Sequence, residues 1–461
     1  MKKLSSLPYP TLILLAGALL RLWGINAAAI WYDEAFTVNM ARLPIGEMFA
    51  QQWLEYSPPL WNLIMRPFVH GPLWLLRTPA MLFSLASLYV VYLLMQKLEF
   101  TAWQQNLTAA MVAFLPGLLW TAQDARVYAL LSLLYLLGWL YALENKPFHL
   151  AVVAALMLYA HNTAPFLLVT LYVLALNHHR EEWRRFATTG AYAALSFVPW
   201  LPSVFSQSDS FWLGDLEPGW AMLQSVFAVW TNTLADIPAL FFIALSLLSV
   251  VRMLINRHSD EYDIVTVALM PALLMLLVSL LFRNIFFYRP LIALVIPFAI
   301  WIAVTLPKNI WAKSFLTLGW ALLLLAGLTN WNPITKGARL DNAAAYISEY
   351  WENGDVLYYT TGTVALPFDY YLHEKPHYLM NTEQNTGLIQ LSHARAFDIP
   401  TGTLTPETVE GRVWVIHPDD VLISEATRES LAWVFENGRQ VGLLEYAQAA
   451  NVEIWLVGGV R

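Results

Sequence analysis

Three short segments carry the residues best suited to catalysis. Asp33 and Glu34 set two carboxylates side by side, and Asp124 and Arg126 place a carboxylate close to a guanidinium. His161 adds an imidazole in a polar break between two apolar stretches. A carboxylate can accept a proton as a general base, and a guanidinium keeps its charge and binds phosphate through two parallel hydrogen bonds. These residue types suit the transfer of a group that is carried on a phosphate.

Each of these residues also has a purely structural interpretation. Asp33 could be the N-cap of a helix that begins at Glu34, because aspartate is a favoured N-cap residue. Asp124 and Arg126 could cap and anchor the helix that follows them, and His161 could be a polar residue satisfied within a tight turn. Taken one at a time, none of the five identifies an enzyme.

The elements that must position these residues are membrane helices. Of the 461 residues, 58% are hydrophobic and 13% are charged, and the mean hydropathy is +0.50. Soluble globular proteins carry about 25% charged residues, so this composition excludes a cytosolic enzyme and a disordered chain. The absence of cysteine excludes disulfides, thiolate zinc sites and iron–sulfur clusters. The net charge of −7 argues against nucleic acid as a partner.

Apolar stretches long enough to cross a bilayer predict about eleven transmembrane helices. The polar break at His161–Thr163 favours two short helices over one long helix, and the polar residues of Met222–Leu234 favour a helix that lies in the membrane plane. The predicted spans are Pro8–Asn26, Pro79–Gln96, Asn106–Thr121, Arg126–Leu143, Phe148–Ala160, Thr163–Leu176, Ala187–Val204, Ile237–Ile255, Ile264–Phe282, Tyr288–Leu306 and Ala312–Leu328.

The distribution of basic residues sets the orientation of these spans. With the N-terminus in the cytoplasm, 11 of the 18 Lys and Arg residues before Thr335 fall on the cytoplasmic side, as the positive-inside rule requires. Met1–Ala29 also has the pattern of a signal peptide, but Arg21 and Trp23 favour a retained helix. In both cases the loop after it, and the C-terminal region, are extracytoplasmic.

The other seven basic residues of this region fall on the outer side, and every one is an arginine. An arginine-only outer face is what a lipid-linked phosphate would need, although anchoring of single helices at the interface is the simpler interpretation of each member. These residues are Arg21, Arg42, Arg66, Arg77, Arg126, Arg283 and Arg289.

The chain is predicted to have two domains: a membrane body at 1–330, with its first outer loop at 27–78, and a soluble α/β domain at 335–461. The second region carries 8 Lys and Arg against 17 Asp and Glu, a net charge of −9. Alternating helix and strand patterns predict the α/β class. Asp369, His373 and His377 have the residue types of a metal site, but they are interpreted as ordinary polar residues on the surface. The predicted elements are Asn342–Trp351, Asp355–Thr360, Val413–His417, Glu425–Glu436 and Val452–Val457.

The order of the motifs resembles the GT-C glycosyltransferases, in the bacterial branch related to the protein O-mannosyltransferases (glycosyltransferase family 39) and the lipid A aminoarabinose transferase. The Asp-Glu pair in the first outer loop is the hallmark of that branch, and five further segments look like its motifs in the same order. The six segments are Tyr32–Ala35, Ser57–Trp61, Leu76–Pro79, Gln123–Leu130, Ala160–Thr163 and Phe287–Arg289 with Pro297.

Three departures from the family pattern bear on the site. Ser57 stands where a histidine is common, so any contact made by that histidine is absent. Pro290 follows Arg289 where tyrosine is usual, which leaves Arg283 as the substitute for Arg289. Asp124 occupies a position that is often glutamate, so its carboxylate is carried on a shorter side chain.

The resemblance implies an inverting membrane glycosyltransferase with an undecaprenyl-phosphate-type sugar donor and a lipid, glycan or protein acceptor. It places the enzyme in the bacterial cytoplasmic (inner) membrane, with transfer on the extracytoplasmic side. Asp33 is then the general base, and Glu34 orients it or contacts the acceptor. Donor phosphate is assigned to Arg126, Arg289 and Arg283, and other substrate contacts to Asp124, Tyr128, His161 and Tyr288. No tightly bound metal is expected; a loosely held divalent cation on the phosphate is left open.

Two other classes of function compete with the enzyme. A lipid-linked-sugar flippase or other transporter would also be polytopic, but no inverted repeats or mid-bilayer charges are found. A non-catalytic scaffold would give no reason for Asp33, Asp124 and Arg126 to gather on one side of the membrane.

Overall fold

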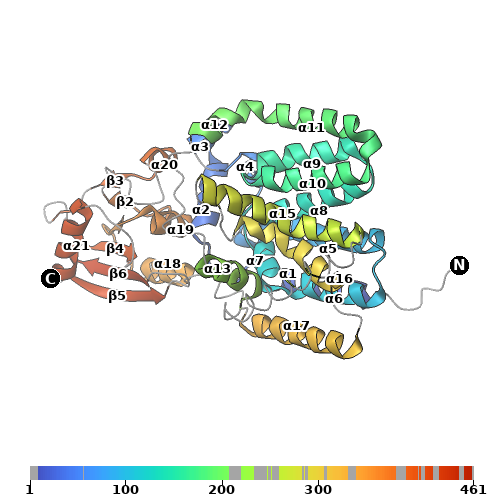
Figure 1. Ribbon diagram of the computed structural model, residues 1–461. Coiled ribbons are helices and arrows are strands. Elements are labelled where there is room, and N and C mark those ends of the chain that lie inside the picture. Colours follow the sequence, from blue (N-terminus) through green and yellow to red (C-terminus); the bar gives the residue numbers. More distant parts are fainter. Residues whose placement is uncertain are drawn as a thin grey trace. The chain divides into compact units, whose positions relative to one another are not determined.

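The computed structural model divides the chain into two compact units, which are described separately (Figure 1). The helical unit comprises Met1–Trp23, Trp53–Ile64 and Arg77–Asn332, and the sheet unit comprises Gly24–Gln52, Met65–Leu76 and Pro333–Arg461. The predicted division into a membrane body at 1–330 and a soluble domain at 335–461 stays a prediction. The structure describes residues 9–54, 57–206, 220–232, 247, 251, 259–282, 285, 289–305, 309–330, 339–380, 391–402, 404–405, 411–418, 425–445 and 451–458.

The helical unit is built almost wholly of α-helices that pack side by side. α8 packs against α9 and α10, α10 against α15, and α1 against α6 (Figure 1). α8 is apolar all round and nearly every residue in it is buried, as expected for an interior helix. Its elements are α1 (Tyr9–Leu22), most of α4 (Leu60–Met65) and α5 (Leu73–Lys97), α6 (Ala102–Phe114), α7 (Pro116–Ala122), α8 (Tyr128–Leu143), α9 (Pro147–Ala160), α10 (Ala164–His178), η1 (Arg180–Glu182), α11 (Trp183–Phe197), η2 (Val198–Trp200), α12 (Leu201–Ser206), α13 (Trp220–Thr231), α15 (Ser259–Leu281), η3 (Pro290–Leu294), α16 (Val295–Thr305) and α17 (Ile310–Asn330).

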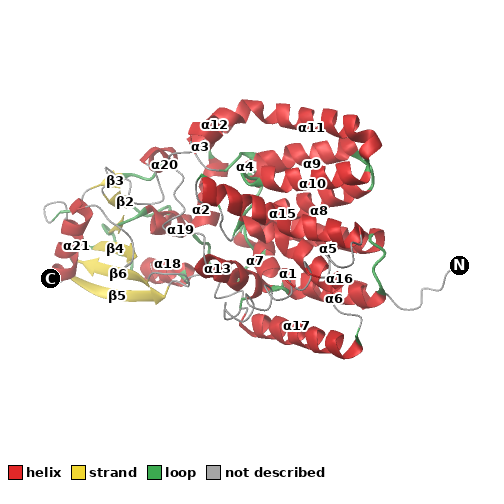
Figure 2. Ribbon diagram, viewed as in Figure 1, coloured by secondary structure: helices red, strands yellow, loops and turns green. Residues whose placement is uncertain are grey.

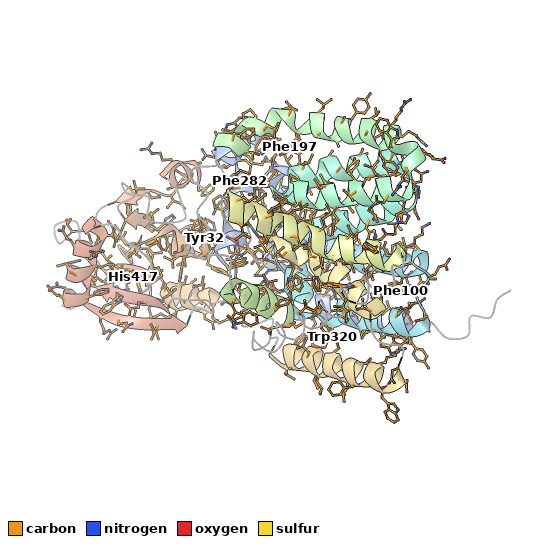
Figure 3. The ribbon with its side chains drawn as sticks, in the orientation of Figure 1. Tyr32, Phe100, Phe197, Phe282, Trp320 and His417 are labelled. Atoms are coloured by element: carbon orange, nitrogen blue, oxygen red, sulfur yellow. The ribbon has the colours of Figure 1, made fainter. Side chains whose placement is uncertain are left out.

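The predicted break at His161 is confirmed, because α9 ends at Ala160 and α10 begins at Ala164. Two helices, Leu73–Lys97 and Tyr262–Leu281, are long and apolar enough to cross a membrane. Six shorter apolar helices accompany them in the described part of the chain, and α17 buries Trp320 (Figure 3). The predicted span Ile237–Ile255 falls almost entirely outside the described residues, and the number of spans stays a prediction.

Proline accounts for two errors in the predicted helix boundaries. The predicted span Asn106–Thr121 is two helices, because Pro116 cannot donate its backbone nitrogen and begins α7 as a first-turn residue. The predicted start at Pro79 is also wrong: α5 begins six residues earlier, at Leu73, and Pro79 lies inside it.

Arg21 ties three helices of this unit together from a fully buried position. Its Nε donates to Ser84 Oγ on α5 (2.9 Å), and Nη1 donates to Gly17 O on its own helix (2.9 Å). Nη1 and Nη2 also donate to the carbonyls of Ala113 and Val112 on α6, each at 3.0 Å. Because carbonyl groups occupy this guanidinium, its role is structural.

The sheet unit contains a six-stranded sheet in the order β3-β2-β1-β4-β6-β5 (Figure 2). β1 pairs in parallel with β2 and β4, β2 pairs in parallel with β3, and β6 is antiparallel to β4 and β5. The strands are β1 (Val356–Tyr359), β2 (His377–Met380), β3 (Thr401–Gly402), β4 (Val413–Pro418), β5 (Gly438–Glu445) and β6 (Asn451–Val457).

Helices cover both faces of this sheet. Val413 and Val415 of β4 pack with Leu431 and Val434 of α21, while Trp414 points the other way toward α18. Burial on both faces explains why all of β4 is buried. The helices of the unit are α2 (Tyr32–Arg42), most of α3 (Ile45–Leu54), α18 (Leu340–Glu349), α19 (Gly362–Leu372), α20 (Leu391–Ala396) and α21 (Glu425–Asn437).

The predicted α/β class is confirmed, and all five predicted elements are present with shifts of no more than two residues at either end. α19, α20, β2, β3 and β5 were not predicted. The prediction that Asp369 and His377 lie on the surface is wrong, because Asp369 is 8% exposed and His377 Nε2 lies 3.5 Å from its Oδ1.

Candidate active site

The turn between α7 and α8, residues 123–128, is fixed by hydrogen bonds from two directions. Gln123 Nε2 donates to the carbonyls of Arg21 (3.1 Å) and Trp23 (2.6 Å), which lie at the end of α1. The last carbonyls of a helix have no partner within it, so this amide caps α1. From the other side, Trp61 Nε1 donates to Ala125 O (2.9 Å) in a buried bond. The backbone that carries Asp124 and Arg126 is therefore held at both neighbouring residues.

His161 lies beside this turn within the helical unit. Its ring centroid is 6.0 Å from that of Tyr128, the first residue of α8. Burial of the imidazole and, second, the positive charge of Arg126 lower the pKa of His161 to about 4. The imidazole is therefore neutral at physiological pH.

Thr163 fixes which nitrogen of His161 carries the proton. The Thr163 backbone N–H donates to His161 Nδ1 (3.2 Å), and the Thr163 hydroxyl lies 2.8 Å from the same nitrogen. A backbone N–H can only donate, so Nδ1 is the acceptor and the neutral ring carries its proton on Nε2. His161 thus offers a hydrogen-bond donor in the neighbourhood of the Arg126 guanidinium. A neutral donor and a cation together favour an anionic group such as phosphate.

Arg289 stands at the start of η3, the short helix that leads into α16. η3 packs against α8, the helix that begins with Tyr128. The predicted site residues Arg283 and Tyr288 lie outside the described residues. The structure thus brings Arg126, Tyr128 and His161 together and places Arg289 on an element that contacts the same helix.

The carboxylate pair lies in the sheet unit, at the start of α2. The helix begins at Tyr32 (Figure 3), and its N-cap is Trp31, which makes no side-chain capping bond. Asp33 is therefore in the first helical turn, and the alternative that it is an N-cap is wrong. Carboxylates in the first turn are favoured by the partial positive charge at a helix N-terminus. Asp33 is partly exposed, whereas Glu34 is fully buried.

Two of the outer-side arginines hold the far end of α2. Arg66 Nη1 donates to the carbonyls of Ala41 (3.1 Å) and Leu43 (2.6 Å), and Arg42 Nη2 donates to Val69 O (3.2 Å). Like the buried arginine of α1, these side chains serve the backbone. The arginine-only pattern therefore overstated the number of phosphate-binding candidates.

A buried ionisable pair lies between α19 and β2 in the same unit. Burial raises the pKa of the Asp369 carboxyl, and charge interactions with His377, His373 and Arg42 oppose that rise. His377 Nδ1 lies 2.9 Å from Lys375 O and donates to it, which leaves Nε2 facing Asp369. Among the described residues no group of three or more His, Cys, Asp or Glu could hold a metal ion. The expectation about metal stays a prediction.

Sequence reasoning missed three residues that support these groups: Gln123, Trp61 and Thr163. Trp61 and Gln123 lie within two of the family-like segments, and Thr163 stands two positions after His161 in the sequence. Their roles depend on partners that are distant in the chain or on ring orientation.

Comparison of the sequence with protein-family models and with curated proteins finds no match. Among solved structures, ArnT from Cupriavidus metallidurans bound to undecaprenyl phosphate is similar, with a TM-score of 0.57 and 11% identity, over 98% of this chain and 99% of that one. The Archaeoglobus fulgidus oligosaccharyltransferase in complex with Zn and sulfate gives a TM-score of 0.48 at 11% identity, over 87% of this chain and 67% of that one. The arabinofuranosyltransferase AftD from Mycobacteria gives 0.47 at 14% identity, over 99% of this chain and 42% of that one.

The similarity to ArnT shows the fold, and the other two TM-scores are too low to add to it. ArnT is the lipid A aminoarabinose transferase, so the GT-C resemblance predicted from the motifs is confirmed at the level of the fold. That fold is a polytopic helical body with a small C-terminal sheet domain.

Proposed function

We propose that the chain is a membrane glycosyltransferase that moves a sugar from a polyprenyl phosphate, of the undecaprenyl type, to an acceptor hydroxyl. The observation that carries this proposal is the grouping of Arg126, Tyr128 and His161 in a chain with the fold of ArnT, which was crystallised with undecaprenyl phosphate. The proposal includes the extracytoplasmic side of the bacterial inner membrane as the place of transfer.

The donor phosphate is assigned to the helical unit. Arg126 would bind its oxygens, His161 would donate from Nε2, and Arg289 would add a second positive charge, with Arg283 as the substitute. Negative charge grows on the phosphate as the sugar leaves, so fixed cations and donors stabilise the transition state more than the ground state. A phosphate is already a good leaving group, so no general acid is required. Asp124, Tyr128 and Tyr288 are assigned to further contacts with the substrate.

The acceptor is assigned to the carboxylate pair of α2. Asp33 would accept the proton of the acceptor hydroxyl as its oxygen attacks the anomeric carbon. The new carbon–oxygen bond forms while the bond to the phosphate oxygen breaks, and the electron pair of that bond stays on the phosphate. One direct displacement inverts the anomeric carbon. Glu34 is fully buried, which favours its role in orienting Asp33 over direct contact with the acceptor.

Recognition of the polyprenyl phosphate can be tested without knowledge of the sugar. We would titrate the purified protein with undecaprenyl phosphate and, as the matched neutral lipid, with undecaprenol. The proposal predicts tight binding of the phosphate only, and weaker binding in Arg289→Ala. Equal affinity for the two lipids would refute phosphate recognition, and an Arg289→Ala variant with unchanged affinity would remove Arg289 from the site.

A further inference from the structure

The first turn of α2 has no side-chain cap at its N-cap residue. That residue, Trp31, is extended. The residue before it, Ile30, is fully buried, and its backbone N–H donates to the hydroxyl of Tyr371 at 2.9 Å. A buried N–H needs a partner, and here that partner comes from a residue 341 positions away, near the end of α19.

Further contacts within the sheet unit hold α2 in the same place. α19 packs directly against α2, and the ring of Phe397 meets that of Phe36 edge to face with centroids 5.6 Å apart. Every residue of α2 from Glu34 to Ala41 is buried. The helix therefore cannot rotate about its axis without breaking these contacts. Rotation would move Asp33 and Glu34 together, since they are adjacent on the first turn.

We propose that Tyr371 is a positioning residue for the Asp33–Glu34 pair, so that one task of the C-terminal sheet is to aim the catalytic helix. This inference rests on the proposed function, because it takes Asp33 as the base. The Tyr371 hydroxyl fixes the direction in which the backbone passes Ile30 and turns into α2. Asp33 follows three residues later, so a change at Ile30 reaches the carboxylate through the first turn of the helix.

The test replaces Tyr371 with phenylalanine, which removes one oxygen and keeps the ring. Tyr370→Phe is the matched control, because the same change falls on the neighbouring residue of α19, which makes no bond to Ile30. Hydrogen–deuterium exchange of peptides covering residues 28–42 is expected to be about fivefold faster in Tyr371→Phe, the effect of one lost hydrogen bond, and unchanged in Tyr370→Phe. Unchanged exchange in Tyr371→Phe would overturn the inference.

The second measurement is the rate at which the protein turns over an undecaprenyl-phosphate sugar. Tyr371→Phe should lower kcat about fivefold and leave the KM for the donor unchanged, because donor binding is assigned to the other unit. Phe397→Leu, which trims the ring against Phe36, should shift both readouts in the same direction by a smaller factor. Faster exchange with unchanged kcat would overturn the positioning role.

The failure of this inference can be told from failure of the proposed function. If Asp33→Asn is inactive while Tyr371→Phe leaves kcat and exchange unchanged, only the positioning role is wrong. If Asp33→Asn turns over donor like the wild type, the assignment of the base is wrong, and the positioning role falls with it.

Discussion

The turn at residues 123–128 and the first turn of α2 both carry candidate catalytic groups, but they are supported in different ways. The turn lies in the helical unit. Trp61 donates a hydrogen bond to the backbone of the turn, and the Gln123 side chain of the turn donates to carbonyls at the end of α1. α2 lies in the sheet unit and is held by a tyrosine hydroxyl and an aromatic contact. The groups assigned to the donor phosphate and to the acceptor proton therefore rest on separate supports. Substitutions should therefore perturb one assignment without the other.

Asp355→Asn should have the largest effect on the sheet unit without a change in donor binding. The Asp355 carboxylate is 2% exposed and accepts bonds from Arg412 Nε (2.9 Å), Arg412 Nη2 (2.7 Å) and Trp414 Nε1 (2.8 Å). The variant removes the buried one of the two carboxylates that pair with Arg412 and leaves Glu352, which should cost about 1.5–3 kcal/mol. We expect faster hydrogen exchange in β1 and β4 with unchanged binding of undecaprenyl phosphate, and no effect from Glu349→Gln on the exposed side of α18. Loss of donor binding would contradict the separation.

Because of the same carboxylate, we expect the sheet unit to lose stability at low pH. Burial alone would raise the pKa of Asp355, but the hydrogen bonds from Arg412 and Trp414 bring it below its usual value. The stabilisation is therefore fully present above the ordinary aspartate pKa of about 4, and it is lost as the pH falls through the lower pKa of the folded chain. Exchange of β1 and β4 followed from pH 6 to pH 3 should show this loss in the wild type.

Arg126→Gln should give the complementary result in the helical unit. A hydrogen bond to a charged group contributes about 1.5–3 kcal/mol, so the Kd for undecaprenyl phosphate should rise about 10- to 100-fold. Hydrogen exchange in α2 should stay as in the wild type. Arg184→Gln, on the exposed surface of α11, should leave the Kd unchanged. An unchanged Kd in Arg126→Gln would remove this residue from the donor site.

Trp61→Phe tests the support of the turn and should have a smaller effect. The variant replaces the indole by a smaller aromatic ring and loses the bond from Nε1 to Ala125 O, about 1 kcal/mol, so donor affinity should fall about fivefold. Trp183→Phe on α11 is the control, because that side chain is exposed. If Trp61→Phe bound undecaprenyl phosphate like the wild type, the position of Arg126 would not depend on this bond.

Thr163→Val should have the smallest effect, visible in the pH dependence of binding. Loss of the hydroxyl removes one donor to His161 Nδ1, which destabilises the neutral ring and raises its pKa above that of the wild type. Below this raised pKa the protonated ring attracts phosphate more strongly. Relative to the wild type, affinity for undecaprenyl phosphate should rise by a factor of about 2 to 3 between pH 7 and pH 5, about the effect of one partly exposed charge pair. Thr163→Ser should follow the wild type, and equal profiles in all three proteins would contradict the assigned tautomer.

Local patterns in the sequence predicted much of the fold. The polar residues at His161–Thr163 marked a true helix break, and the apolar runs at Val413–His417 and Val452–Val457 marked true strands. α19 was missed because Pro367 lies inside it, and an internal proline normally ends a helical pattern. β2 and β3 are too short to show an alternating pattern.

The sequence allowed the grouping of Arg126, Tyr128 and His161 to be expected, but not the side chains that support these residues. Arg126 and Tyr128 lie two positions apart in one motif, and the turn with His161 was predicted on the same side of the membrane as that motif. The sequence could not show that Arg21 donates its hydrogen bonds to backbone carbonyls, because residue type does not reveal a side chain's partner. The bond between Ile30 and Tyr371 joins residues 341 positions apart, and no local pattern records such a pairing.

Sugar transfer from a polyprenyl phosphate with Asp33 as the base can be measured as turnover of the donor. We would incubate the wild type and Asp33→Asn with a panel of undecaprenyl-phosphate sugars, with membrane extract as the source of acceptor, and measure released undecaprenyl phosphate by mass spectrometry. We expect the wild type to consume at least one donor, and Asp33→Asn to bind the same donor but turn it over about 10²- to 10⁴-fold more slowly. Equal turnover by the two proteins, or a donor that is bound and never consumed by the wild type, would contradict the proposed function.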